Sequence, residues 1–312
     1  MEKIDIREPN LVGKLFKPTN SQPGKLPAII LLSGSDGGIP GTNAIPEFFI
    51  ENLSQLGYIV LALAYFGVEG LPDHLENIEL EYFQAAIKWL QVQTEIDATR
   101  VSLIGNSRGG ELALILGTLF PSEIHSIIAY APSSVIGGGF PYPNHPAWVH
   151  CGEPMTPFLP GLANANLNLT EREDLEFVNR QQATPHDANN PYIVADLFRA
   201  RNQAQADLSQ LAIPVEKIQC PLLLLSGDMD AIWPSNLYCE FIVRRLKQYQ
   251  APIKFKHINY LNAGHGILAA YDAPIYHPIG GFWCKLGGTP DGNKLANEES
   301  WQAVKSFLQT NL

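Results

Sequence analysis

The residues Gly105-Asn106-Ser107-Arg108-Gly109 form a G-x-S-x-G pattern, the part of the chain with the clearest chemical meaning. The pattern directly follows the apolar run 101–104 and opens a helix-like stretch that ends near Leu119. At such a strand-to-helix turn, small residues on both sides leave room for a tight bend, and the serine stands at a helix N-terminus that favours negative charge. The pattern predicts that Ser107 is a nucleophile; the alternative is an ordinary turn in which the serine caps the helix.

A serine hydroxyl is a weak nucleophile near neutral pH and needs a histidine that a carboxylate holds in place. In this kind of site the acid, and then the histidine, follow the serine along the chain. The apolar run 222–225 leads into a turn with two aspartates, and the expected place of the acid a few residues past the strand favours Asp230, with Asp228 as the alternative. His265 stands between two glycines after the next apolar run and is predicted to be the general base. The loop histidines at 145, 150, 186 and 277 carry no motif and are expected to be surface or structural residues.

Two backbone N–H groups must stabilise the oxyanion of an acyl-transfer intermediate. One is predicted to be that of Arg108, next after the nucleophile, and the other that of Gly34 or Ser35, with Ser35 preferred, in the glycine-rich loop 33–38. That loop lacks the Lys-Ser/Thr ending of a phosphate-binding loop and a full G-x-G-x-x-G, so nucleotide binding is not expected. The cysteines at 151, 220, 239 and 284 form no C-x-x-C pair and no short-spaced Cys/His cluster of the structural-zinc kind, so no metal and no cofactor is predicted.

The elements that would position these residues alternate between strands and helices. Apolar runs predict strands at 28–32, 58–63, 101–104, 127–130, 221–225 and 253–260, and amphipathic stretches predict helices at 45–56, 75–93, 109–119, 235–249 and 300–312. Continuous apolar strands alternating with helices are typical of a mostly parallel sheet covered on both faces. The predicted fold class is therefore α/β, and the segment Val12–Phe16 is expected to add an antiparallel edge strand or hairpin.

One long stretch, from residue 133 to about 214, interrupts this rhythm with glycine and proline clusters and no clear strand. A structureless loop of this length is uncommon inside a compact domain unless it is a lid or small subdomain. We therefore expect residues 133–213 to form an inserted cap over the strand ends, within a single domain spanning 1–312, and expect helix near 192–211. A disordered linker is the alternative, and the aromatic residues of the stretch argue against it.

Composition excludes several classes of protein. The 312 residues are 46% hydrophobic and 17% charged, which excludes disorder, collagen and coiled coil. A formal net charge of −10 argues against nucleic acid and anionic membranes as partners. The amino-terminal residues contain no apolar signal core, and no apolar run approaches the roughly 18 residues needed to span a bilayer, so the expected compartment is the cytoplasm.

Several uncommon strings, in sequence order, resemble one known family. These are the loop 33–38 with the run 61–67, the string 80–83, the G-x-S-x-G turn 105–109 (the elbow), the string 213–216, Asp230 with 233–235, the string 263–265, and 287–290 with 300–302. From about Leu26 to Leu312 the chain resembles the catalytic C-terminal domain of the acyl-CoA thioesterase and bile acid-CoA:amino acid N-acyltransferase family. The resemblance implies an α/β-hydrolase fold with Ser107 as nucleophile, Asp230 as orienting acid and His265 as base.

The chain departs from that family in two places. About 25 residues stand where acyl-CoA-acting members generally carry an immunoglobulin-like domain, and the segment between Tyr130 and Pro214 is longer than usual. Serine at the elbow, where the family's transferases carry cysteine, favours hydrolysis. Binding of CoA phosphates would need basic groups such as Arg172, Arg180, Arg199 and Arg201, for which a solvated helix face is the alternative.

These observations together predict a serine hydrolase that cleaves a small-molecule acyl thioester or ester through an acyl-serine intermediate, with an acyl-CoA thioesterase-like activity as the leading hypothesis. A carboxylesterase or dienelactone-type hydrolase of small esters is the first alternative. A catalytically silent protein that binds an acyl ligand is the second. The sequence predicts no oligomeric state.

Overall fold

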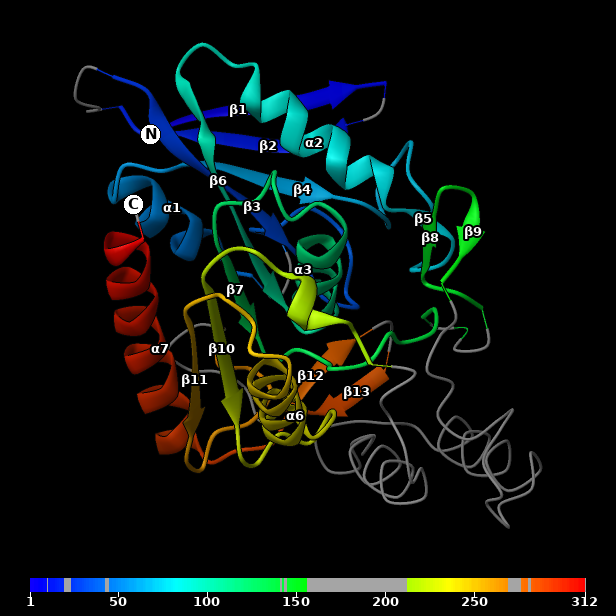
Figure 1. The fold of residues 1–312 in the computed structure, drawn as a ribbon, viewed down its shortest axis with the longest axis vertical. Coiled ribbons are helices and arrows are strands. Elements are labelled where there is room, and N and C mark those ends of the chain that lie inside the picture. Colours follow the sequence, from blue (N-terminus) through cyan, green and yellow to red (C-terminus); the bar gives the residue numbers. More distant parts are fainter. Residues whose placement is uncertain are drawn as a thin grey trace.

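The computed structural model describes residues 1–9, 11–19, 24–42, 45–140, 142, 145–155, 212–268, 276–279 and 282–311. Its centre is an eight-stranded sheet in the order β1-β2-β4-β3-β6-β7-β10-β11 (Figure 1). The strands are β1 (Glu2–Glu8), β2 (Leu11–Lys17), β3 (Leu26–Leu32), β4 (Ile59–Ala64), β6 (Ile96–Asn106), β7 (Ile127–Tyr130), β10 (Leu222–Gly227) and β11 (Phe255–Tyr260). All pairings from β4 to β11 are parallel, whereas β1 and β2 form an antiparallel hairpin at the edge.

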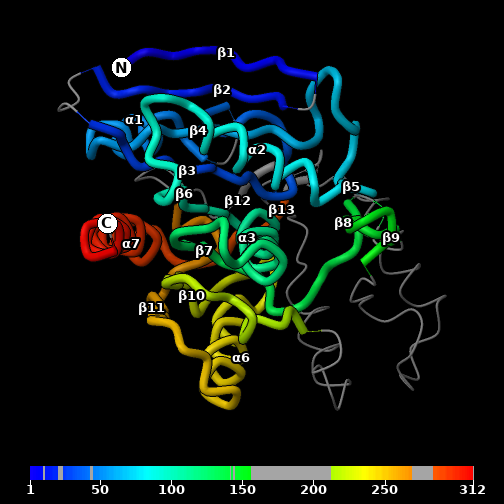
Figure 2. Tube along the Cα trace, turned by 45° about the horizontal axis from the view of Figure 1, so that its top comes forward, coloured from blue at the N-terminus to red at the C-terminus, as the bar shows by residue number. Residues whose placement is uncertain are grey.

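The central strands are apolar on both faces because helices cover both faces of the sheet. Along β3, Ile29 and Leu31 belong to the core beneath α1 (Glu47–Gln55) and α7 (Pro290–Thr310), and Ile30 and Leu32 belong to the opposite core. That opposite core includes residues of α2 (Glu81–Gln91), α3 (Arg108–Leu119) and α6 (Ser235–Gln248), so the molecule has three layers (Figures 1 and 2). A short 3-10 helix, Val215–Lys217, leads into β10.

These elements confirm the α/β class and the hairpin expected at 12–16, but two predicted helices have other starts than expected: the helix expected at 300–312 begins at Pro290, and the helix expected at 75–93 begins later than predicted. The pattern at 75–93 predicts a single helix, whereas α2 starts at Glu81 and residues 78–79 form the short strand β5 (Ile78–Glu79). The backbone of 75–80 is hydrogen-bonded to another part of the chain: Leu75 exchanges bonds with Phe140, and Leu80 N–H donates to Val149. These long-range bonds replace the i to i−4 bonds that a helix would need.

The predicted cap is described at its two ends only. The described part includes two strands, β8 (Trp148–His150) and β9 (Glu153–Pro154), where the sequence shows no clear strand. They join β5 in a three-stranded sheet, and a further pair, β12 (Tyr276–Ile279) and β13 (Phe282–Lys285), lies later in the chain. Residues 156–211, which include the helix expected at 192–211, lie outside the described residues.

Within the part of the chain that the structure describes, no helix is both long and apolar enough to cross a bilayer.

Candidate active site

The turn between β6 and α3 holds Ser107 in a backbone conformation that non-glycine residues rarely adopt. Its φ is 56° and its ψ is −118°, and its N–H donates to the Tyr130 carbonyl at 2.8 Å. A Cβ at Gly105 would lie 2.0 Å from the Gly109 carbonyl oxygen, and a Cβ at Gly109 would lie 2.1 Å from the Leu32 oxygen. The two glycines are therefore a steric requirement of this sharp turn, which explains the spacing of the pattern.

The loop after β11 brings His265 to the serine. His265 Nε2 lies 2.8 Å from Ser107 Oγ, and its Nδ1 lies 2.8 Å from Asp230 Oδ2. The Trp233 ring packs edge-on against the imidazole, with centroids 5.4 Å apart, and its indole N–H donates to the Ala131 carbonyl at 2.9 Å. This packing restricts the imidazole to one orientation between its two partners.

Asp230 is 1% exposed and accepts hydrogen bonds on both carboxylate oxygens. Oδ1 accepts from the backbone N–H groups of Ile232 and Trp233, at 2.9 and 3.2 Å, and Oδ2 accepts from the Ser235 hydroxyl at 2.6 Å as well as facing His265. In a Ser-His-Asp arrangement the carboxylate accepts the N–H at Nδ1 of the histidine, which leaves Nε2 as an acceptor for the serine hydroxyl. The structure brings Asp230, rather than the alternative Asp228, into contact with the histidine.

The two segments that carry the expected oxyanion N–H groups flank the serine. Arg108 occupies the first turn of α3, where backbone N–H groups lack partners within the helix. The loop after β3 passes the serine so closely that a Cβ at Gly34 would lie 3.2 Å from Ser107 Cβ, and Ser35 is the next residue. The hydroxyl of Tyr65 donates to the Ser33 carbonyl at 2.5 Å and fixes the start of this loop.

A buried ion pair beneath the elbow is the part of the site that the sequence interpretation missed. The Arg108 guanidinium lies 2.7 Å from the Glu111 carboxylate, with side chains 7% and 0% exposed. It also donates to the carbonyls of Gly137 and Gly138, while the Gly137 N–H and the Trp148 indole N–H donate to Glu111 at 3.0 Å each. Burial raises the pKa of Glu111, and the Arg108 charge opposes that shift. Two opposite charges three residues apart in an otherwise apolar helix were the available signal.

This network ties the nucleophile's helix to the described base of the expected cap. The Arg108 guanidinium also stacks on the Trp148 ring, 5.6 Å from its centroid, and thus contacts Gly137, Gly138 and Trp148. The arginines at 172, 180, 199 and 201, named as candidates for CoA phosphates, lie outside the described residues.

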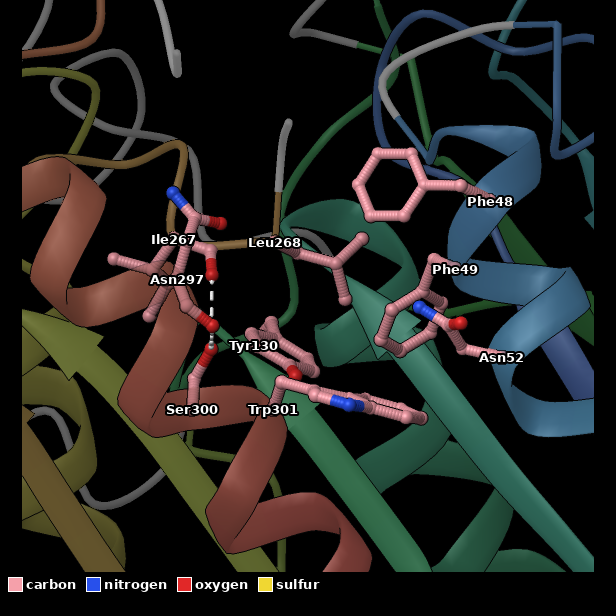
Figure 3. A pocket seen from close by; sticks show the side chains of 9 residues that line it. All are labelled: Phe48, Phe49, Asn52, Tyr130, Ile267, Leu268, Asn297, Ser300 and Trp301. Atoms are coloured by element: carbon pink, nitrogen blue, oxygen red, sulfur yellow. Dashed lines mark hydrogen bonds between the residues drawn. The ribbon is translucent and has the colours of Figure 1, made fainter. Parts of the chain in front are cut away.

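A small cavity lies between α1, α7 and the residues that follow His265 (Figure 3). Its lining is mostly aromatic and aliphatic: Phe48, Phe49, Asn52, Tyr130, Ile267, Leu268, Asn297, Ser300 and Trp301. The space open to solvent-sized molecules is about 20 Å³, roughly enough for one water. The cavity therefore cannot accommodate an acyl chain, and its lining serves mainly to pack α7 against α1.

The chain has the α/β-hydrolase fold. Solved structures with this fold include DcsB in complex with a substrate analogue, at 11% identity and a TM-score of 0.58, which covers 100% of this chain and 99% of that one. A dienelactone hydrolase-like promiscuous phosphotriesterase, P91, from metagenomic libraries aligns at 13% identity and a TM-score of 0.54, over 99% of this chain and 97% of that one. At such identities the likeness concerns the fold alone.

The family follows from a sequence comparison that covers most of the chain. Residues 78–312 match the family model described as "BAAT / Acyl-CoA thioester hydrolase C terminal", and the chain belongs to this family. Relatives include the mitochondrial acyl-coenzyme A thioesterase 2 of Mus musculus, 27% identical over 100% of this chain and 61% of the relative. Acyl-coenzyme A thioesterase 1 of Homo sapiens is 27% identical over 98% of this chain and 65% of the relative. Acyl-coenzyme A amino acid N-acyltransferase 2 of Mus musculus is 27% identical over 100% of this chain and 66% of the relative. The chain thus spans 61–66% of the length of these relatives.

Proposed function

We propose that the chain is a serine hydrolase that cleaves an acyl thioester or ester through an acyl-serine intermediate, with acyl-CoA thioesters as the leading substrate class. The observation that carries the proposal is the continuous hydrogen-bonded chain from Asp230 through His265 to Ser107, with 2.8 Å at each step. The family supports the substrate class, because its relatives are named for acyl-CoA thioester hydrolysis and for acyl transfer. Serine at the elbow favours hydrolysis over transfer.

In the first half-reaction, Ser107 Oγ attacks the acyl carbonyl carbon and His265 Nε2 accepts the hydroxyl proton. Asp230 stabilises the imidazolium and keeps the productive tautomer. The backbone N–H groups of Arg108 and Ser35 stabilise the oxyanion, which collapses as the C–S or C–O bond breaks and the imidazolium protonates the leaving thiol or alcohol. The second half-reaction uses water: His265 accepts its proton, hydroxide attacks the acyl-serine, and the proton returns to Ser107 as the acid leaves.

One observation keeps hydrolysis of small esters as a second candidate function. The positive charge next to the nucleophile, Arg108, is held by Glu111 and by two backbone carbonyls, so it is not free to bind a phosphate. A small uncharged ester would need no such group. The third candidate, an inactive acyl-binding protein, gives no reason for the buried and fully hydrogen-bonded carboxylate behind His265.

We further propose that residues 1–312 form one domain in which 133–213 is a cap over the carboxyl ends of the strands. A single sheet running from Glu2 to Tyr260, and the hydrogen bonds from Gly137 and Trp148 to Glu111 of α3, support this organisation. The cytoplasmic compartment stays a prediction that fractionation of cells would test.

A matched substrate panel tests the proposal. Hydrolysis of acyl-CoA thioesters from C4 to C16 is compared with that of the corresponding oxyesters, using the unmodified chain, Ser107→Ala and Ser122→Ala. Ser122 is exposed beyond the carboxyl end of α3 and serves as the control serine. We expect activity to be lost in Ser107→Ala and retained in Ser122→Ala. Full activity in Ser107→Ala would overturn the proposal, and a preference for oxyesters would favour the second candidate.

A further inference from the structure

Three side chains able to bind a metal ion meet outside the candidate active site, where the β8–β9 hairpin touches the start of α2 (Figure 1). Glu81 Oε1 lies 2.8 Å from His150 Nδ1 and 3.5 Å from Cys151 Sγ, and the sulfur lies 3.9 Å from Nδ1 and 3.8 Å from Nε2 of the same ring. The backbone N–H of Cys151 also donates to Glu81 Oε1, at 2.9 Å, and holds the turn against the carboxylate. Ligand atoms of three types, carboxylate oxygen, imidazole nitrogen and thiol sulfur, thus lie within 4.8 Å of one another.

The shape of this cluster is close to one face of a tetrahedral zinc site. Zinc bonds of about 2.3 Å to sulfur and about 2.0–2.1 Å to nitrogen or oxygen, at tetrahedral angles, separate the ligand atoms by roughly 3.3–3.6 Å. The observed separations are 2.8 Å between oxygen and nitrogen, 3.5 Å between oxygen and sulfur and 3.9 Å between nitrogen and sulfur, so the side chains would have to adjust by about 0.5 Å to enclose the ion. Thiolate, imidazole and carboxylate together suit zinc, whereas calcium and magnesium take oxygen ligands.

The backbone at Cys151 provides a second, independent observation. Cys151 has φ 54° and Gly152 has φ 78°, and they form the two-residue turn between the paired residues His150 and Glu153. Turns with positive φ at both central residues favour Asn, Asp or Gly at the first, because a larger side chain is strained there. Cysteine is a poor choice for the turn, but its conformation places the thiol beside Glu81 and His150. Backbone strain of this kind often marks a functional position.

The charges around the cluster favour a cation. The second oxygen of Glu81, Oε2, is buried and has no hydrogen-bond partner within the part of the chain that the structure describes. A bound dication would compensate the Glu81 carboxylate and take the place of the thiol proton.

We propose that Glu81, His150 and Cys151 bind a zinc ion, with water in the fourth, solvent-facing position. The ion would join the hairpin, which belongs to the expected cap, to the core helix α2. Trp148, two residues before His150, contacts Glu111 beneath the elbow, so zinc would restrain the same segment from its outer side. The site is separate from Ser107 and stands whether or not the proposed hydrolase activity is correct.

The test is a metal titration of the full chain, prepared metal-free and without an affinity tag. We expect zinc to bind at one equivalent and to raise the melting temperature, and cobalt(II) to give the near-ultraviolet charge-transfer band of a thiolate ligand. Cys151 is the exposed cysteine and the other three are buried, so zinc should also slow alkylation of this thiol. Absence of saturable binding at one equivalent would overturn the proposal.

Variants separate a specific site from general surface binding. Cys151→Ser and Glu81→Gln should each weaken zinc binding by about tenfold or more. Cys151→Asn should remove binding while raising the melting temperature of the metal-free protein, because asparagine suits the turn. The control is His145→Ala: His145 Nδ1 also faces a carboxylate, Glu76, at 2.8 Å, but without a thiol. Equal affinity in the unmodified chain and the Cys151 and Glu81 variants would refute the assignment.

Discussion

The buried pair of Arg108 and Glu111 makes a quantitative prediction about stability. Replacing Arg108 with Met keeps much of the side-chain volume but leaves the Glu111 carboxylate, which is 0% exposed, with two N–H donors and no positive charge. It also removes the donor to the carbonyls of Gly137 and Gly138. Removing one member of a buried ion pair costs about 3–5 kcal/mol, so we expect Arg108→Met to lower the free energy of unfolding by that amount.

A second substitution should recover part of this loss. In the double variant Arg108→Met with Glu111→Gln, the amide oxygen still accepts from Gly137 and Trp148, and no isolated charge remains. We expect recovery of about 1–3 kcal/mol, the usual cost of leaving a buried polar or charged group unsatisfied. The two substitutions are therefore coupled, and a double-mutant cycle measures the coupling.

The loss should also depend on pH. Burial raises the pKa of Glu111 above its usual 4.5, so between that value and the folded pKa the native state binds more protons than the unfolded chain. The stabilising contribution of protonated Glu111 to the free energy of unfolding is therefore fully present below pH 4.5. This contribution is lost as the pH rises through the pKa of Glu111 in the folded protein. Without Arg108 the shift is larger, so the deficit of Arg108→Met should grow as the pH rises.

The assay is urea unfolding, at several pH values, of the unmodified chain, Arg108→Met, Glu111→Gln and the double variant, with Arg100→Met as the control. Arg100 forms an ion pair with Asp97 at the same i,i+3 spacing and 2.8 Å, but with side chains 29% and 30% exposed. Surface pairs contribute about 0–1 kcal/mol, so Arg100→Met should have little effect. Equal losses for Arg108→Met and Arg100→Met, or no recovery in the double variant, would refute the reasoning.

Three further outcomes are expected. Asp230→Asn should lower kcat by about 10⁴ with little change in KM, because the wrong tautomer of His265 is then favoured; a loss below tenfold in steady-state kinetics would contradict this role. Gly109→Ala should cost about 3 kcal/mol or more in urea unfolding, because its Cβ would lie 2.1 Å from the Leu32 oxygen. Burial lowers the pKa of His257 below 6.5, so the unfolded chain binds more protons there and the free energy of unfolding falls as the pH drops below that value. His257→Asn should reduce the slope of the free energy of unfolding against pH in this range. An unchanged slope would exclude His257 as its source.

The sequence carries most of the fold and the core of the site because those signals are local. The strands β3, β4 and β10 are continuous apolar runs, and each residue of the Asp230–His265–Ser107 chain stands in a short turn directly after a strand. Strands that run parallel bring such turns to one edge of the sheet. Local pattern and chain order were therefore sufficient to select these residues.

The features that the sequence did not disclose depend on contacts between distant segments. Residues 75–80 have a helical pattern, but their backbone bonds to 140–149 decide the outcome. The metal-binding hypothesis has the same origin: Glu81 lies about 70 positions from its partners, and His150 by itself carries no motif. Pairings at such separation follow from tertiary packing, which periodicity does not encode.

The most direct test of the central claim is intact-mass analysis after reaction with a fluorophosphonate, which modifies only an activated serine. We expect a single adduct per chain, located at Ser107 by peptide mapping, and its loss in His265→Gln, in which the hydrogen-bond partner of Ser107 Oγ is replaced. An unreactive chain, an adduct on another serine, or undiminished labelling of His265→Gln would contradict the proposed mechanism.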